Sequence, residues 1–217
     1  MELVASPLKV NAVFTTKPEL LASLNGDFRK ETVSIKDMEK MSGLTTPSEI
    51  IAIGLQPEPN QISFDSSLIL ALDGIRDPGN MGTIIRTARW FGVTTIMCSS
   101  DCVDVYNPKV VQGAMGALFH TSIVSDNLVE KLIEAKTKGF SLVTATLDGC
   151  NVYLSQLPSK NVLVIGNESN GVSDMVQELS DIQVKIPNYE IEQQVESLNA
   201  ATATAILLSV ITQGNKN

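Results

Sequence analysis

Three short loops of this sequence combine glycines with side chains that can bind or orient charged groups. The first loop begins at Asp73, contains Asn80, and leads into a stretch that carries Arg86 and Arg89. The N-terminus of a helix offers free N–H groups and the positive end of a dipole, which attract anions, and guanidinium groups bind phosphate or carboxylate. This stretch therefore predicts an anion site, with two solvated arginines beside a plain turn as the alternative.

We expect a helix over residues 80–91, with Asn80 as its N-cap and Gly92 at its end. Gly82 and Arg86 are four residues apart, so the missing side chain of Gly82 predicts open space beside the Arg86 guanidinium. Neither a GK[ST] ending nor GxGxxG is present, which disfavours the common mononucleotide and dinucleotide loops. At 100° per residue, the side opposite the apolar face carries Gly82, Arg86 and Arg89, with Trp90 beside them.

The second loop, GNESNG, follows an apolar stretch that ends at Gly166. Gly166 and Gly171 permit positive φ angles and a close backbone approach to a ligand. Glu168 would stand at the edge of a sheet, where its carboxylate could orient an arginine or a hydroxyl group. An ordinary turn with an exposed glutamate is the alternative.

The third loop places Ser197 and Asn199 at the start of a helix expected over residues 197–212. That helix is apolar nearly all round, so it needs burial on more than one side, which favours a core helix that also meets a partner subunit. Ser197 could simply cap the helix, because serine is a preferred N-cap. Asn199 in a first turn is harder to explain by helix propensity alone.

These loops sit between alternating strand and helix patterns. Apolar strands interleaved with helices predict an α/β fold with a parallel sheet covered on both faces. Ligands of such sheets bind beyond the carboxyl ends of the strands, here at Asp73, Gly166 and Pro187. The expected strands lie near 68–72, 94–98, 120–124, 141–146, 161–166 and 183–186, and the helices at 80–91, 108–117, 127–138, after 172, and 197–212.

A proline-containing polar stretch divides the chain, so we predict a small α/β domain over 1–57, a linker over 58–66 and a larger domain over 67–217. The first domain reads as three short strands with two short helices between them. It is small for an independent domain, so either it leans on the rest of the protein or it is shortened at its front.

The composition bounds the function. The net charge of −8, with 6 basic and 9 acidic side chains up to residue 65, argues against general polyanion binding but not against a local basic patch. No secretory signal is visible and the longest apolar run, 198–211, is too short to span a bilayer, so we expect a cytoplasmic protein without membrane contact. Three sparse cysteines suit reduced core thiols, and the lone His120 makes a metal site unexpected.

Read together, the three loops resemble the SpoU (TrmH-like) family of RNA ribose 2′-O-methyltransferases in the SPOUT superfamily. The resemblance covers about 68–212 and, more weakly, the N-terminal segment. The motif Asn-x-Gly-x-x-x-Arg-x-Ala is matched by Asn80, Gly82, Arg86 and Ala88. The other two motifs are matched by Gly166, Asn167, Glu168 and Gly171, and by Ile186, Pro187, Ser197, Leu198 and Asn199.

The resemblance implies a C-terminal trefoil knot, S-adenosylmethionine (AdoMet) bound in the knot, and a homodimer formed through helix 197–212. It implies methyl transfer to a ribose 2′-OH of rRNA or tRNA, with Arg86 either as the base or as the group that holds a phosphate. Asn80 and Glu168 would orient Arg86, while Ser197 and Asn199 position the site. The expected cofactor-binding residues are Thr144, Ala145, Ile165, Gly166, Asn167, Gly171, Ile186 and Leu198, and the expected RNA contacts are Arg86, Arg89 and Lys109.

Two departures from the family pattern keep alternatives open. Ser169 stands where many members have glycine, and the loop before Ser197 is about three residues longer, with Glu190, Glu192 and Glu196. Acids facing an anionic substrate would be unfavourable, so a knotted RNA-binding protein with impaired catalysis is the first alternative. An unrelated phosphate-binding α/β protein is the second. The N-terminal domain resembles the family's small RNA-recognition domain, although its acidic balance suits weak RNA binding.

Overall fold

A computed structural model describes residues 2–44, 46–57, 62–189 and 196–214. The chain forms two compact units, Met1–Pro59 and Asn60–Asn217. The linker predicted over 58–66 falls partly on residues 58–61, which lie outside the described residues. The same holds for Glu190 and Glu192 of the third loop, whereas Glu196 is described and exposed.

The N-terminal unit is a three-stranded sheet in the order β2-β1-β3, with β1 and β2 parallel and β1 and β3 antiparallel. The predicted strands and helices of this unit are confirmed. Its small core contains Val13, Leu24 and Met38. The elements are β1 (Val10–Thr15), α1 (Pro18–Ala22), β2 (Arg29–Thr32), α2 (Ile35–Met41) and β3 (Ile50–Gly54).

The C-terminal unit contains a six-stranded sheet in the order β6-β5-β4-β8-β7-β9, in which every neighbouring pair is parallel. The prediction of an α/β fold with a parallel sheet is therefore confirmed. The strands are β4 (Leu68–Asp73), β5 (Thr95–Ser99), β6 (Ser122–Asp126), β7 (Ser141–Asn151), β8 (Asn161–Gly166) and β9 (Ile182–Lys185).

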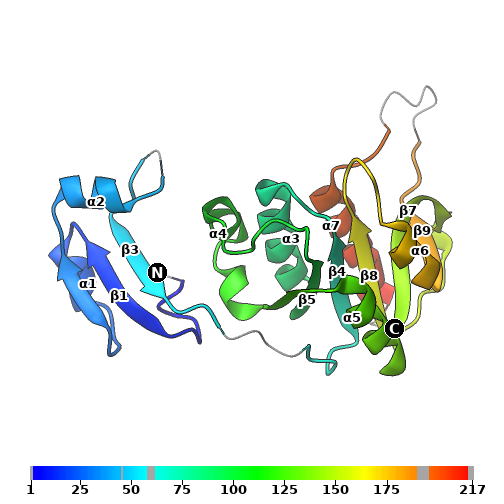
Figure 1. Ribbon diagram of the computed structural model, residues 1–217, viewed down its shortest axis with the longest axis horizontal. Helices are drawn as coiled ribbons and strands as arrows, with labels where there is room; N and C mark the ends of the chain where they lie inside the picture. Colours follow the sequence, from blue (N-terminus) through cyan, green and yellow to red (C-terminus); the bar gives the residue numbers. More distant parts are fainter. Residues whose placement is uncertain (1, 45, 58–61, 190–195, 215–217) are drawn as a thin grey trace. The chain divides into compact units, whose positions relative to one another are not determined.

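Helices cover both faces of this sheet (Figure 1). The helices α3, α4 and α7 pack on one face, and α5 and α6 pack on the other. Their bounds are α3 (Pro78–Trp90), α4 (Pro108–Ala114), α5 (Leu128–Thr137), α6 (Asp174–Leu179) and α7 (Ala200–Gly214), with short 3-10 turns η1 (Ala117–His120) and η2 (Val152–Leu154).

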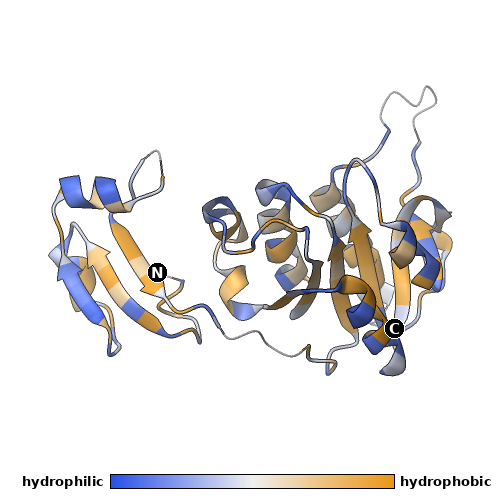
Figure 2. Ribbon diagram, viewed as in Figure 1, coloured by the Kyte–Doolittle hydropathy of each residue, from blue (hydrophilic) through white to orange (hydrophobic). Residues whose placement is uncertain are grey.

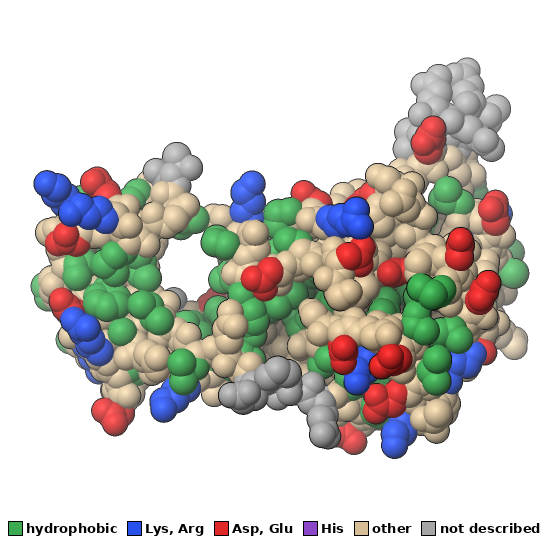
Figure 3. Space-filling model, in the orientation of Figure 1, with side chains coloured by type: hydrophobic (Ala, Val, Ile, Leu, Met, Phe, Trp, Pro, Cys, Tyr) green, Lys and Arg blue, Asp and Glu red, His purple; other side chains and the backbone are tan. Residues whose placement is uncertain are grey.

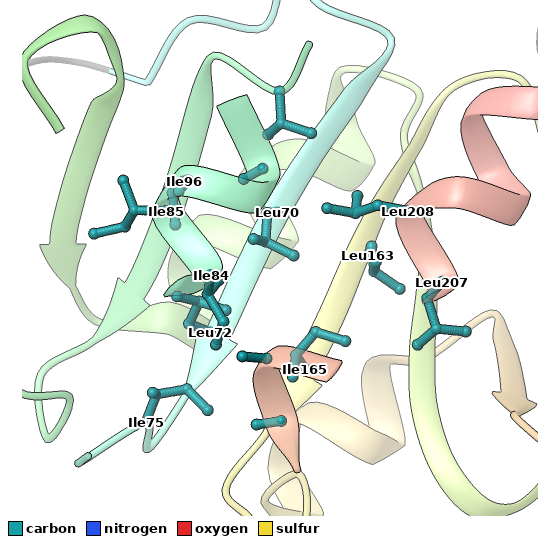
Figure 4. Close-up of a cluster of buried hydrophobic side chains, with 14 of the residues drawn as sticks. Leu70, Leu72, Ile75, Ile84, Ile85, Ile96, Leu163, Ile165, Leu207 and Leu208 are labelled. Atoms are coloured by element: carbon teal, nitrogen blue, oxygen red, sulfur yellow. The ribbon is translucent and has the colours of Figure 1, made fainter. Parts of the chain in front are cut away.

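The central strand β4 shows why the sheet needs two helical layers. All of its residues are buried, and successive side chains point to opposite faces. Leu70 and Leu72 pack toward α3 and α7, where Figure 4 shows them beside Ile84 and Leu208, while Ile69 joins the core under α5 and α6. The mostly apolar colour of β4 and β8 in Figure 2 reflects this two-sided burial.

Two helix starts differ from the sequence-based expectation. Asp77, not Asn80, is the N-cap of α3, because the Asp77 carboxylate accepts the Asn80 N–H at 2.7 Å and Pro78 occupies the first turn. The helix α7 begins at Ala200, three residues later than predicted, and the Asn199 side chain accepts the N–H groups of Ala201 and Thr202 at 3.0 and 3.2 Å. The expected roles of Asn80 as a cap and of Asn199 as a first-turn residue were therefore wrong.

The described residues include no helix whose length and apolar character would let it cross a lipid bilayer.

Candidate active site

The candidate site lies where the strand order of the large sheet reverses. From β4 the chain continues to β5 and β6 on one side, while β8 lies on the other side of β4 and is followed by β7 and then β9 toward the far edge. The last residues of β4 and β8, Asp73 and Gly166, are partners in the parallel register. Such a switch point leaves a crevice beyond the carboxyl ends of the strands, so two of the predicted loops start side by side.

The loop after β8 closes on itself. The backbones of Asn167 and Gly171 exchange two hydrogen bonds of 2.9 and 2.8 Å, and Gly171 has a φ of +69°. A Cβ on Gly166 would lie only 2.2 Å from the carbonyl carbon of Gly171. Gly166 is thus required by the close approach of the loop to itself, whereas the sequence had suggested a need for positive φ or for a ligand.

Side chains at the end of β4 hold this loop in place. The Asn167 amide donates to the Gly74 carbonyl at 2.8 Å and its oxygen accepts the Ser169 N–H at 2.9 Å. Asp73, which is buried, accepts the Ser173 N–H at 2.7 Å. The loop therefore keeps a defined position relative to α3, which starts a few residues after Asp73.

Asn80, Glu168 and Asn199 form a chain of side-chain hydrogen bonds that joins the three predicted loops. The Asn80 amide donates to the Glu168 carboxylate, and the Asn199 amide donates to the Asn80 oxygen at 2.8 Å. Asn80 and Glu168 are half-buried, while Asn199 is exposed. Residues separated by 88 and 119 positions in the sequence thus meet at one point.

The hydrogen bonds in this chain all run in one direction. Amide groups at the start of α7 donate to Asn199, Asn199 donates to Asn80, and Asn80 donates to Glu168. Each bond polarises the next, so the positive end of the α7 dipole supports the negative charge on Glu168. This arrangement holds a carboxylate in a fixed orientation at the rim of the crevice.

The predicted cations lie on the surface outside this network. Arg86 and Arg89 on α3 and Lys109 in the first turn of α4 are exposed, and within the described residues none of the three side chains has a hydrogen bond or ion pair. Arg86 follows Asn80 by six residues, about 9 Å along the helix axis. Asn80 and Glu168 therefore contact each other and not Arg86, which they were expected to orient.

Gly82 has a different purpose from the one expected. A Cβ on Gly82 would lie 2.9 Å from the Val110 carbonyl oxygen and 3.0 Å from the Cα of Gly113, both in α4. Gly82 is buried and lets the backbones of α3 and α4 approach closely. The interpretation that it opens space beside Arg86 was wrong.

A cavity of about 370 Å³ lies beside the hydrogen-bonded network. Its volume falls within the range of small-molecule sites, roughly 300–1,000 Å³. Seven of the eight expected cofactor-binding residues line it, namely Ala145, Ile165, Gly166, Asn167, Gly171, Ile186 and Leu198. Thr144 is not among the lining residues but is fully buried behind them, and the catalytic candidates Glu168 and Ser197 also line the cavity.

The sequence reasoning missed a bulge in β7 that forms one wall of this cavity. Val184 of β9 pairs with both Ala145 and Cys150, so residues 146–149 loop out of the ladder. Leu147 and Asp148 then line the cavity, and a Cβ on Gly149 would lie 2.6 Å from the β9 backbone. The predicted strand 141–146 was too short, because β7 runs to Asn151. A glycine inside a strand often marks a bulge, so Gly149 would have been the signal had the strand been extended past it.

The charge of the cavity lining suits a cationic ligand. The lining includes the carboxylates of Asp148 and Glu168 and, among the described residues, no lysine, arginine or histidine. The Thr146 hydroxyl is buried at the wall and has no hydrogen-bond partner in the described part of the chain. Because buried polar groups are nearly always paired, this hydroxyl is available to a ligand.

Comparison with known proteins identifies the family. Residues 67–209 match the model of the SpoU rRNA methylase family. The chain is 33% identical over 165 residues to the 23S rRNA (guanosine(2553)-2′-O)-methyltransferase RlmP of Bacillus subtilis, covering 75% of this chain and 64% of that protein. It spans from 33% to 64% of the length of the first curated relatives that it matches.

Solved structures show the same fold. A TrmH-family protein from Porphyromonas gingivalis superposes with a TM-score of 0.88 at 34% identity, covering 97% of this chain and 84% of the other. An AdoMet-bound rRNA methyltransferase from Sinorhizobium meliloti superposes with a TM-score of 0.83 at 26% identity, covering 98% of this chain and 85% of the other. With its family model matched over most of the larger unit, the chain belongs to the SpoU rRNA methylase family.

Proposed function

We propose that this protein transfers a methyl group from AdoMet to a ribose 2′-OH of RNA, in rRNA or tRNA. The observation that carries the proposal is the hydrogen-bonded chain of Asn199, Asn80 and Glu168 at the rim of a cavity lined by acids. Each of its three members comes from a different motif of the family. RlmP, a relative, is named as a 2′-O-methyltransferase of 23S rRNA.

The residues around the cavity fit AdoMet. AdoMet supplies a methyl group on a positively charged sulfonium, which a nucleophilic oxygen can accept. Asp148 and Glu168 favour that positive charge, since no cation in the described lining opposes it. Ile165, Ile186 and Leu207 offer apolar walls, and the Thr146 hydroxyl offers a polar contact.

Glu168 and Arg86 take different roles in this proposal. The Asn80 amide occupies one oxygen of Glu168, and the other oxygen can accept the hydrogen bond of the substrate hydroxyl. Arg86 binds an RNA phosphate, because it is exposed and because a guanidinium group is a poor base but a good phosphate ligand. Ser197 and Asn199 position the third loop against the other two.

The exposed side of α7 supports the proposed homodimer. Ala205, Ile206 and Val210 of α7 line a groove with Tyr153, which is 51% exposed. An apolar stripe on the surface of a helix favours association with another chain. Light scattering at micromolar concentration should give a dimer mass and Ile206→Glu a monomer mass; a monomer for the unchanged protein would contradict the proposal.

The proposed trefoil knot is supported by the path of the chain and by the family resemblance. The chain leaves β9 at one edge of the sheet, and α7 then packs against α3 and β8 near the middle. The N-terminal unit is proposed to help recognise the substrate RNA, and the cytoplasm stays the expected location.

The central test combines AdoMet binding with methyl transfer. The full chain should bind AdoMet in a calorimeter and transfer label from AdoMet to unmodified ribosomal RNA, with the label released as a 2′-O-methylnucleoside after digestion. Arg86→Ala should keep AdoMet binding, because Arg86 does not line the cavity, but should lose most transfer.

The outcomes separate the possible functions. Absence of both AdoMet binding and label transfer to any RNA would refute the enzymatic proposal, while full transfer by Arg86→Ala would refute only the role of Arg86. Because the chain belongs to the SpoU family, it is not an unrelated phosphate-binding protein. The names of the relatives give no support to the catalytically impaired alternative.

A further inference from the structure

The outer surface of α3 carries a tryptophan that the fold leaves almost uncovered. Trp90 is 85% exposed, the most exposed large hydrophobic side chain among the described residues, and it is the single tryptophan of the sequence. Within the described part of the chain, its ring has no aromatic or cation partner. A single exposed apolar side chain is ordinary, but a tryptophan offers a large flat face on which a ligand can stack.

The neighbours of Trp90 indicate what kind of ligand would cover it. Arg86 lies one helical turn before Trp90 on the same side of α3, and Arg89 precedes it directly. No residue of α3 is acidic, and both arginines lack ion pairs within the described residues. An aromatic ring next to two unpaired guanidinium groups can stack on a base while the arginines bind nearby phosphates.

This surface continues from the candidate active site. Gly79, Thr83, Arg86 and Trp90 follow each other at spacings of three and four residues, all with outward side chains except the glycine. The stripe starts beside Asn80, and Trp90 lies about 15 Å along the axis from it. That distance corresponds to a few nucleotides of extended single strand.

Charge distinguishes RNA from a second copy of the chain as the partner. The protein has a net charge of −8, and on the face shown in Figure 3 acidic and basic side chains are scattered without a large basic patch. The unpaired Arg86 and Arg89 nevertheless place two positive charges just before Trp90 on α3. In a two-fold symmetric contact centred on this stripe, arginines would face arginines, which is unfavourable.

We propose that Trp90 stacks on a base of single-stranded substrate RNA, with Arg86 and Arg89 binding phosphates on the side of that base that faces the candidate active site. This inference rests on the proposed methyltransferase function and adds a binding residue remote from the reacting atoms. Trp90 thereby helps to select unpaired RNA, because only an unpaired nucleotide offers a free face for stacking.

The single tryptophan makes the test direct. Titration of the full chain with a single-stranded oligouridylate should quench the tryptophan emission. Trp90→Ala should weaken binding of the same RNA, measured by fluorescence anisotropy of a labelled strand, by about 5- to 150-fold, and Trp90→Phe should recover part of it. Ile133→Ala on α5, which removes a 47% exposed side chain from the opposite face, serves as the matched control and should bind normally.

Three outcomes would overturn or separate the proposals. Equal RNA affinity in Trp90→Ala and the unchanged protein would overturn the stacking proposal. A blue shift of the emission with rising protein concentration and without RNA, together with dissociation of Trp90→Ala in light scattering, would instead assign the ring to a subunit contact. Trp90→Ala should bind AdoMet with the same affinity as the unchanged protein in calorimetry, because Trp90 does not line the cavity. If the unchanged protein itself failed to bind AdoMet, that result would count against the methyltransferase function and not against the stacking of Trp90 on RNA.

Discussion

Replacing Gly82 by alanine tests whether the close crossing of α3 and α4 is the reason for this glycine. In an ordinary helix interior, Gly→Ala stabilises a protein by about 1 kcal/mol. Here the new Cβ would lie 2.9 Å from the Val110 carbonyl oxygen, 3.0 Å from the Cα of Gly113 and 3.1 Å from the Ala114 nitrogen. All three are backbone atoms, so α4 as a whole would have to retreat by about half an ångström.

We expect this overlap to exceed the gain in helix propensity. Gly82→Ala should lower the free energy of unfolding of the C-terminal unit by about 1–3 kcal/mol, the usual cost of overfilling a packed interior. For a unit of this size the melting temperature should fall by roughly 3–10 °C. Urea unfolding followed by circular dichroism, together with a thermal melt, measures both quantities.

Gly113 provides the matched control on the other helix of the same crossing. A Cβ on Gly113 would approach Gly82 no closer than 3.4 Å, an ordinary contact. Gly113→Ala should therefore stay within about 0.5 kcal/mol of the unchanged protein or gain up to about 1 kcal/mol. If Gly82→Ala were as stable as Gly113→Ala, the close-packing explanation for Gly82 would be refuted.

Two further predictions concern Asn80, in the first turn of α3, and Cys102, which follows β5. Asn80→Asp replaces the amide that donates to Glu168 by a second carboxylate, which repels the first. The free energy of unfolding in urea should be about 1–2 kcal/mol lower for this variant than for Asn170→Asp, which adds the same charge at an exposed position. Equal free energies for the two variants would contradict the contact between Asn80 and Glu168. The pKa of the Cys102 thiol is lowered to about 7, chiefly by the hydrogen bond from Cys98, and against burial, which raises it. A folded-state pKa below the usual 9.0 means that the stabilisation belongs to the thiolate, is complete at high pH and is lost as the pH falls through about 7. Alkylation of Cys102, followed by mass spectrometry, should therefore rise with a midpoint near pH 7, and Cys98→Ala should shift that midpoint upward; an unchanged midpoint would remove Cys98 as the cause.

Local patterns were sufficient for the elements of the fold. Continuous apolar runs such as 68–72 and 162–166 predicted buried parallel strands, and the structure places β4 and β8 next to each other at the centre of the sheet. Those predictions succeed because two-sided burial imposes an apolar residue at every position of a strand. Helix starts were less predictable, since Asp77 and Asn80 are both good caps and the Pro78 backbone decides between them.

Local residue patterns specify the family motifs, the alternation of strands and helices, and the three loops that could hold a ligand. Which side chains of those loops meet depends on how the chain packs. Asn80, Glu168 and Asn199 contact one another because β4 and β8 are neighbours and α7 returns to α3, a pairing that no local spacing encodes. The same holds for Gly82, whose missing side chain is explained by α4, some thirty residues away, and for Trp90, whose exposure depends on what the completed fold leaves uncovered. Burial and side-chain partnership are properties of the packed chain, because they depend on which distant segments are brought together.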